Sequence, residues 1–280
     1  MFVRLGMSES SLLMLYFIEH FIKGYNKKLL IEKRKWVLDW FFSTSGYFDV
    51  EVKGRLFEFT CEYDTIMSTE TYNAYFKELL LFVKHNTFDE FYMKCHDLGD
   101  LDSFIPIFYN FVHKTNSLYK PRKIMHKELN GKRILLMHNL SDLMLDQYNN
   151  GNVQKIYPHF PNVDIIVPFK IGYTFMNTPL NECKNIIERA DLIEHSMNNY
   201  IEKHNINLIV ISCGAYSNIF AQKMHKKGIP YIMIGGELEH EFGIIIQRHC
   251  DNKEINEYFI RVPDELKPEN HHMIENGCYW

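Results

Sequence analysis

Residues 208–236, LIVISCGAYSNIFAQKMHKKGIPYIMIGG, decide the fold. Two short apolar runs, 208–211 and 231–234, lie on either side of a helical pattern in 216–227, and both are bounded by turn residues, as buried strands are. A strand, a helix and a second strand in this order are typical of a parallel sheet with right-handed crossovers. The stretch therefore predicts an α/β fold.

The same pattern continues toward the N-terminus. Residues 133–137 and 163–167 are further apolar runs bounded by turn residues, and a long helical stretch covers 180–204. We expect a Rossmann-like α/β fold with a mainly parallel sheet in the C-terminal half. In open sheets of this kind, ligands bind outside the carboxyl ends of the strands.

The first half of the chain is expected to be mostly helical and to pack on that sheet. Apolar residues recur at helical spacing in 8–35, 69–85, 88–94 and 101–114. Ser8 is a candidate N-cap for the first of these helices. The pattern predicts that helices precede the sheet-forming half of the chain.

The main boundary is expected where this helical pattern weakens. Residues 118–132 form a segment with Lys and Pro that ends at Asn130-Gly131. We expect a mainly helical region, 1–125, that contributes Arg4 and Glu9 to the site, and an α/β region, 126–280, that binds the ligand. One integrated domain is the alternative.

Composition narrows the class of protein. The chain has 280 residues, of which 46% are hydrophobic and 24% charged, so we expect it to fold throughout. Its formal charge is −4, whereas nucleic-acid binders usually carry an excess of Lys and Arg. The six Cys form no CxxC pair. A membrane span needs about 20 apolar residues, and the charged residues Arg4, Glu9 and Glu19 interrupt the apolar start of the chain. We expect a cytoplasmic protein without a membrane span and without nucleic acid as a partner.

Three loops follow predicted strands and are expected to lie at one edge of the sheet. They cover 138–141, 212–218 and 235–241, and the first holds His138 and Ser141. In the second loop, Gly214, Ala215, Tyr216 and Asn218 stand where a helix begins, an arrangement that exposes backbone N–H groups to a phosphate. The alternative is that Gly214 and Ala215 only permit a tight turn. The chain has no GxGxxG and no P-loop signature, which removes the main support for a dinucleotide oxidoreductase or a P-loop nucleotidase.

The third loop joins flexible backbone to carboxylates. Gly235 and Gly236 permit close approach of the backbone, and Glu237, Glu239 and Glu241 follow them. In an extended segment Glu237 and Glu239 share a face, whereas in a helix Glu237 and Glu241 do. These carboxylates are candidates for holding Mg²⁺ or Mn²⁺ against a diphosphate. The alternative is a solvated acidic helix start, which the helix dipole favours.

A further pattern, Arg-x-Gly-x-x-Glu, spans Arg4, Gly6 and Glu9. The guanidinium fork of Arg4 suits a diphosphate, and Glu9 can orient it or contact a ribose hydroxyl. A surface Arg and a first-turn Glu are the alternative. The chain contains neither HExxH nor GxSxG, so metalloprotease and α/β-hydrolase classes lack their motifs.

Taken together, these residues resemble a family of polysaccharide-biosynthesis proteins related to the GT-D class of glycosyltransferases. The resemblance is carried by Arg4-x-Gly6-x-x-Glu9, Gly131-Lys-Arg-Ile-Leu-Leu-Met-His138, Gln147-Tyr148, Cys213-Gly-Ala-Tyr216, Gly228, Gly235-Gly236, Phe242-Gly-Ile244 and Glu275-Asn-Gly-Cys-Tyr-Trp280. It implies a Rossmann-like sheet, a nucleoside-diphosphate sugar donor and often a divalent metal bound through Asp-x-Glu. Here that region reads Glu237-Leu238-Glu239. In its many Lys, Asn, Ile and aromatic residues, the chain is also similar to glycosyltransferases of large algal viruses.

The resemblance implies a glycosyltransferase that moves a sugar from a UDP-sugar, for example UDP-xylose, to a hydroxyl of a glycan or glycoprotein. The residues expected to bind the donor are Arg4, Gly6, Glu9, His138, Ser141, Gly214, Ala215, Tyr216, Asn218, Gly235 and Gly236. Glu237 and Glu239 are expected to be catalytic, to hold a divalent metal (Mn or Mg), or both. Two alternatives stay open: a nucleotide-sugar hydrolase or metal-assisted phosphoesterase, and a non-catalytic glycan- or nucleotide-binding protein.

Overall fold

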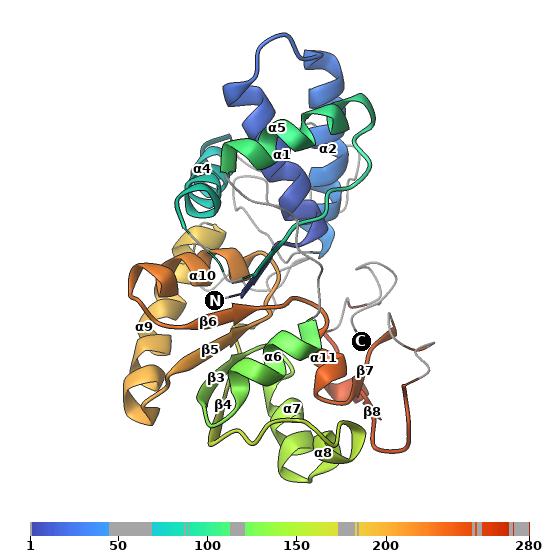
Figure 1. Ribbon diagram of the computed structural model, residues 1–280, viewed down its shortest axis with the longest axis vertical. Helices are drawn as coiled ribbons and strands as arrows, with labels where there is room; N and C mark the ends of the chain where they lie inside the picture. The colour runs from blue at the N-terminus through green and yellow to red at the C-terminus, as the bar shows by residue number, and fades with distance from the viewer. Residues whose placement is uncertain are drawn as a thin grey trace.

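The core of the protein is a six-stranded sheet in the order β2-β1-β6-β5-β3-β4, and all neighbouring strands run parallel (Figure 1). The computed structural model describes residues 2–44, 69–86, 88, 90–112, 121–172, 183, 185–247, 250, 254–268, 271 and 280. The strands are β1 (Phe2–Arg4), β2 (Glu90–Tyr92), β3 (Arg133–Met137), β4 (Ile165–Phe169), β5 (Leu208–Ile211) and β6 (Tyr231–Met233). The Rossmann-like α/β fold predicted from the sequence is confirmed.

Both faces of the sheet are buried, which explains why its strands are continuous apolar runs. Successive side chains of a strand point to opposite faces. In β3, Leu135 and Met137 belong to one buried hydrophobic cluster, whereas Ile134 and Leu136 belong to another. The sheet therefore separates two hydrophobic cores.

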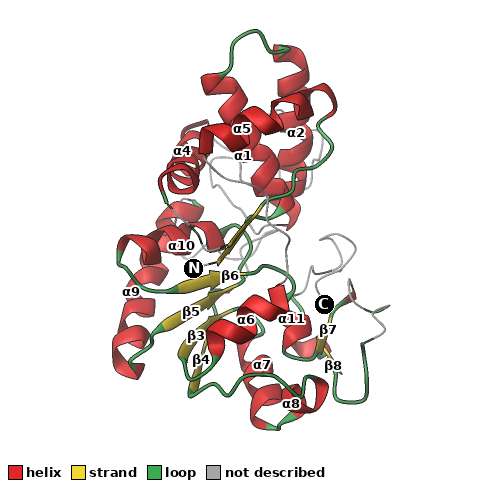
Figure 2. Cartoon of the chain, viewed as in Figure 1, coloured by secondary structure: helices red, strands yellow, loops and turns green. Residues whose placement is uncertain are grey.

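Helices cover each of these faces (Figure 2). The first core contains residues of α1 (Met7–Phe21), α2 (Lys27–Thr44), α4 (Thr69–His85), α5 (Ile105–Val112), α9 (Ile186–His204) and α10 (Tyr216–Lys226). The second contains residues of α6 (Pro121–Leu129), α7 (Ser141–Asn149), α8 (Asn152–Ile156) and α11 (Leu238–Glu241). The remaining elements are η2 (Gly99–Phe104), η4 (Asp264–Leu266) and a two-stranded parallel pair, β7 (Ile244–Ile245) with β8 (Ile260–Arg261). Figure 1 shows α1, α2, α4 and α5 as one group beside the sheet.

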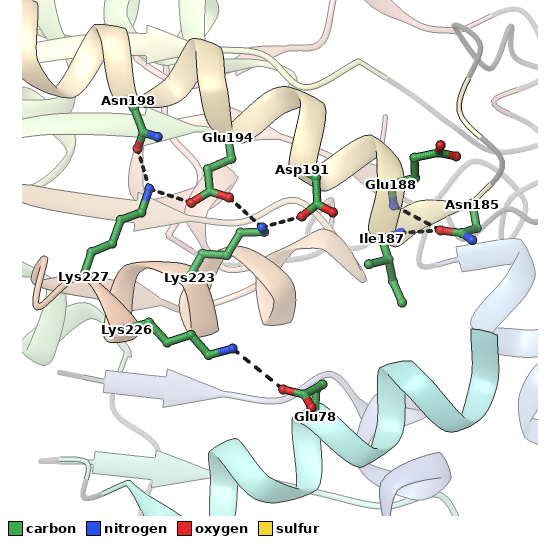
Figure 3. A network of polar contacts seen from close by, with 10 residues as sticks. All are labelled: Glu78, Asn185, Ile187, Glu188, Asp191, Glu194, Asn198, Lys223, Lys226 and Lys227. Carbon is green, nitrogen blue, oxygen red and sulfur yellow. Dashed lines mark hydrogen bonds and ion pairs between the residues drawn. The ribbon is translucent and has the colours of Figure 1, made fainter. Parts of the chain in front are cut away.

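A network of charges fastens α9 to α10 on the first face (Figure 3). Lys223 Nζ lies 2.6 Å from both Asp191 Oδ1 and Glu194 Oε2. Lys227 Nζ lies 2.5 Å from Glu194 Oε1 and donates to Asn198 Oδ1 at 2.8 Å. We call Asp191, Glu194, Asn198, Lys223 and Lys227 the α9–α10 network.

The N-terminal region differs from the expectation because it supplies two strands. Val3 of β1 pairs with Phe91 of β2 on one side and with Met233 of β6 on the other. The prediction of a helix over 88–94 was wrong, since residues 90–92 form β2. The sheet therefore takes strands from both sides of the boundary expected near residue 125.

Other differences concern the ends of helices. The helix predicted over 8–35 is broken, because α1 ends at Phe21 and the chain turns at Gly24, which has a φ of +79°, before α2 begins. The segment expected to be irregular near 118–132 contains α6. The expected start of the long helix at Leu180 and the terminal motif residues 275–279 lie outside the described residues. Across the described part of the chain, no helix has the length and apolar character that a membrane span needs.

The strand order reverses at β3. From β3 the chain passes through α7 and α8 on the second face to β4, and then returns through α9 on the first face to β5, on the other side of β3. In open α/β sheets such a reversal separates the loops that follow the two central strands, and ligands bind there. The loops after β3 and β5 begin at His138 and Ser212.

Candidate functional site

Four of the residues that follow adjacent strands meet at the carboxyl edge of the sheet. Arg4, at the end of β1, donates from Nη1 to Ile234 O at 3.0 Å, and the same nitrogen lies 3.7 Å from Glu237 Oε1. Ser212, after β5, donates from Oγ to Gly235 O at 2.9 Å. We call Arg4, Ser212, Gly235 and Glu237 the edge cluster. The Arg4 and Glu237 side chains are 25% and 38% exposed, so solvent reaches both charges.

The backbone conformation in the edge cluster favours glycine. Gly235 has a φ of +65°, a conformation that residues other than glycine rarely adopt. A Cβ at this position would lie 3.6 Å from Arg4 Nη1, an ordinary van der Waals distance, so the arginine packs against this turn. Gly236 follows and is partly exposed. The structure thus brings together Arg4, Gly235 and Glu237, which were predicted to belong to one site.

The turn between β5 and α10 exposes its backbone but turns its side chains inward. Gly214 is exposed and has a φ of +57°, whereas Ala215, Tyr216 and Asn218 are buried. Ser217 Oγ accepts the N–H of Cys213 at 2.9 Å. Among the predicted donor-binding residues of this turn, only Gly214 is exposed to a ligand.

Tyr75 of α4 holds that turn from inside the protein. Its hydroxyl donates to Ala215 O at 3.0 Å and accepts from Asn218 Nδ2 at 2.8 Å. Burial, and next the negative charge of Glu9, raises the pKa of the Tyr75 hydroxyl well above its ordinary value of 10.0. The hydroxyl therefore stays protonated at neutral pH and can make both hydrogen bonds.

The spacing of Gly6 and Glu9 has a local structural cause. Gly6 is the N-cap of α1, and Glu9 is buried at the third helical position, from which a carboxylate can reach back to the start of its helix. A Cβ at position 6 would lie 2.1 Å from Glu9 Oε2. A larger residue at position 6 would displace this carboxylate, so the motif brings Gly6 and Glu9 together while Arg4 points toward β6.

His138 and Glu239 form a buried pair at the end of β3. Leu140 N–H donates to His138 Nδ1 at 3.0 Å, so Nδ1 carries no proton and the ring proton is on Nε2. Nε2–H then donates to Glu239 Oε1 at 3.1 Å. Ser141, the first residue of α7, is fully buried beside this pair, and its N–H donates to His138 O at 3.1 Å. His138 is therefore a neutral donor that orients Glu239.

The other polar residues of α11 are also paired with different elements. His126 Nε2 of α6 lies 3.3 Å from Glu241 Oε2. Tyr157 Oη lies 2.7 Å from His240 Nδ1 and donates to His240 O at 3.2 Å, so His240 Nδ1 must be the donor of the shorter bond. Glu239, His240 and Glu241 are each less than 5% exposed. This segment is thus a buried helical turn and not a solvated acidic helix start.

The carboxylates that the sequence grouped therefore have separate surroundings. Glu237 faces Arg4, Glu239 faces His138 and Glu241 faces His126. In the part of the chain that the structure describes, no group of three or more His, Cys, Asp or Glu is arranged to hold a metal ion. A divalent metal at Glu237 and Glu239 stays a prediction.

Sequence reasoning missed four polar residues that position the site: Tyr75, His126, Tyr157 and Ser212. Ser212 directly follows a predicted strand, and its place at the strand end is the signal that could have found it. Tyr75 lies 140 residues from Ala215 in the chain, and its helix shows only apolar spacing. No local pattern marks such a residue.

Comparison of the chain with protein-family models, with curated proteins and with solved structures found no match.

Proposed function

We propose that this protein transfers a sugar from a nucleoside-diphosphate sugar, with a UDP-sugar as the donor class, to a hydroxyl group of a glycan. The observation that carries the proposal is the edge cluster. It sets a partly exposed guanidinium and a partly exposed carboxylate beside a glycine turn of positive φ. The guanidinium suits a diphosphate leaving group, and the carboxylate suits the proton of an acceptor hydroxyl. The glycine turn lets the donor approach the backbone closely.

Two further features support a nucleotide at this edge. The strand order reverses between β3 and β5, which is where open α/β sheets bind nucleotides. The exposed Gly214, after β5, and the partly exposed Gly235, after β6, follow neighbouring strands. A donor that lies across the ends of these strands contacts both glycine turns and the guanidinium of Arg4.

In the proposed reaction, the oxygen of the acceptor hydroxyl forms a bond to the anomeric carbon of the donor sugar. The bond between that carbon and the diphosphate oxygen breaks, and its electron pair leaves with the nucleoside diphosphate. The hydroxyl proton passes to the Glu237 carboxylate. Arg4 stabilises the negative charge that develops on the diphosphate.

Glu237 suits the role of base better than Glu239 does. Glu237 is 38% exposed in its side chain, so an acceptor can reach it from solvent, whereas the Glu239 side chain is 5% exposed and accepts from His138. We assign Glu239 a positioning role, since it anchors the start of α11 to the end of β3 and so fixes the loop that carries Glu237.

A thermal-shift screen with UDP and a panel of UDP-sugars, with and without Mn²⁺, tests donor binding, because a ligand that binds the native state raises its apparent stability. We expect a UDP compound to stabilise the wild type and to stabilise Arg4→Ala much less. Arg133→Ala is the matched control, since the guanidinium of Arg133 donates to His204 O at the opposite edge of the sheet. If no UDP compound stabilises the wild type, the proposal fails.

An acceptor panel then identifies the reaction. A transferase forms a new glycoside when a glycan acceptor is added to the stabilising donor. A nucleotide-sugar hydrolase releases free sugar at a rate that the acceptor does not change. Donor binding with neither product would identify a non-catalytic binding protein.

A further inference from the structure

Arg189, in the first turns of α9, is a buried cation with an incomplete set of partners. It is 7% exposed, and its Nη2 donates to Ile171 O at 2.7 Å. Its Nε is buried without a hydrogen-bond partner. Among the residues that the structure describes, no carboxylate pairs with this guanidinium.

This arrangement is costly for a side chain that serves only the fold. An arginine keeps its charge in proteins, and a buried charge destabilises the folded state unless an opposite charge or a full set of hydrogen bonds compensates it. A carbonyl alone gives Arg189 partial compensation, and an anionic ligand would complete it.

The guanidinium packs against Gly172. This residue follows β4, is exposed and has a φ of +76°. A Cβ at this position would lie 3.1 Å from Arg189 Nη2. Glycine therefore leaves room for the guanidinium beside exposed backbone at the end of β4.

We propose that Arg189 binds a phosphate group, in an anion subsite beside Gly172 at the carboxyl end of β4. In the sheet order, β4 lies three strands from β6, and paired strands are about 4.8 Å apart, so this subsite lies roughly 14 Å from the edge cluster. A diphosphate held by Arg4 does not reach that far, and the subsite is therefore distinct from the place proposed for the donor diphosphate. A planar guanidinium fork suits the oxygens of a phosphate group, whose negative charge supplies the counter-charge that Arg189 lacks.

The test compares pyrophosphate binding by the wild type and by Arg189→Met, measured by calorimetry. We expect the affinity to fall by about ten-fold or more, the scale of one lost charge-assisted hydrogen bond. Without ligand, Arg189→Met should unfold at the same temperature as the wild type or a higher one, because it removes a buried charge that lacks a counter-charge. Arg133→Met is the matched control, and its pyrophosphate affinity should equal that of the wild type.

An unchanged affinity in Arg189→Met overturns the proposal. If that variant does not fold, the NMR signal of the Arg189 Nε–H in the wild type tests the proposal. The variant Arg189→Lys serves to assign this signal. We expect this signal to shift when pyrophosphate is added, and an unmoved signal overturns the subsite.

Two further arms identify the class of the oxyanion and separate this inference from the proposed function. Inorganic phosphate should compete with pyrophosphate, whereas a carboxylate ligand such as glucuronate should not; competition by glucuronate alone overturns the phosphate assignment. Pyrophosphate binding requires no sugar transfer. Failure of the transfer assay would therefore count against the proposed function, while loss of pyrophosphate binding in Arg189→Met would still support the subsite.

Discussion

Helix α9 carries charged residues of two kinds, and the difference between them separates structural charges from those available to a ligand. In the α9–α10 network, Asp191 and Glu194 face Lys223 and Lys227, and each of these charges lies beside an opposite one (Figure 3). Arg189, only two positions before Asp191, has a carbonyl as its partner. Charges that neutralise one another fasten helices together, whereas a buried charge without a counter-charge indicates a ligand.

The edge cluster lies between these two cases. Arg4 and Glu237 are 3.7 Å apart, a longer separation than any in the α9–α10 network, and both are partly exposed. A ligand can therefore separate them without burying an unpaired charge. The network should respond to mutation through stability, and the edge cluster through binding and turnover.

The largest expected effect is on the rate of sugar transfer, and it distinguishes Glu237 of the edge cluster from Glu194 of the α9–α10 network. Glu237→Gln should lower the rate of sugar transfer by about 10²-fold or more, the usual scale for loss of a general base, while it leaves donor binding and thermal stability near those of the wild type. Glu194→Gln should leave transfer unchanged and lower the unfolding temperature. Transfer rates and thermal denaturation of both purified variants check this. Equal transfer rates in the two variants would show that Glu237 is not the general base.

A second prediction concerns the turn after β5, which depends on a buried hydroxyl and not on charges. Tyr75→Phe leaves the Asn218 amide and the Ala215 carbonyl without this partner, and we expect it to lower the free energy of unfolding by about 1–3 kcal/mol. Tyr200→Phe is the control, since Tyr200 is 42% exposed, and its effect should be under about 0.5 kcal/mol. Urea unfolding measures both. Similar values for the two variants would show that the hydroxyl does not hold the turn.

The smallest expected effect is the pH dependence of the α9–α10 network. Desolvation acts to raise the pKa of Glu194, but hydrogen bonds and charges from Lys223 and Lys227 outweigh it and lower this pKa below its ordinary 4.5. A lowered folded-state pKa stabilises the protein fully above pH 4.5, and the stabilisation is lost as the pH falls through the folded-state value. The difference in unfolding free energy between the wild type and Glu194→Gln should therefore shrink between pH 7 and about pH 3, by about 1 kcal/mol or less. A difference in unfolding free energy that does not depend on pH would contradict this prediction.

Much of the sheet could be predicted because its central strands are buried on both faces. Residues 133–137 and 208–211 are continuous apolar runs, and the structure forms strands at these bounds. The helix over 69–85 was likewise predicted from its periodicity and is confirmed. By contrast, β1 and β2 have three residues each, which is too short for a periodic pattern.

The candidate site could be predicted only in part. Arg4 and Glu237 were both named from the sequence, but they meet because β1 and β6 are neighbours, and β1 was not predicted. The partners of Glu239 and Glu241 come from the loop after β3 and from α6, and no spacing within 237–241 specifies them. Arg189 could not be found at all, since what distinguishes it is a missing counter-charge, which is a property of the folded structure.

The place of β1 inside the sheet has a consequence for folding during synthesis. β1 is made before every other strand, yet it pairs with both β2 and β6, and the bond between Arg4 and Ile234 closes a loop of 230 residues. Such long-range pairing is slow, and one edge of a nascent β1 keeps unpaired N–H and C=O groups until β6 leaves the ribosome. The edge cluster therefore assembles among the last parts of the molecule, and a chain that stalls before residue 231 would carry Arg4 without its partners.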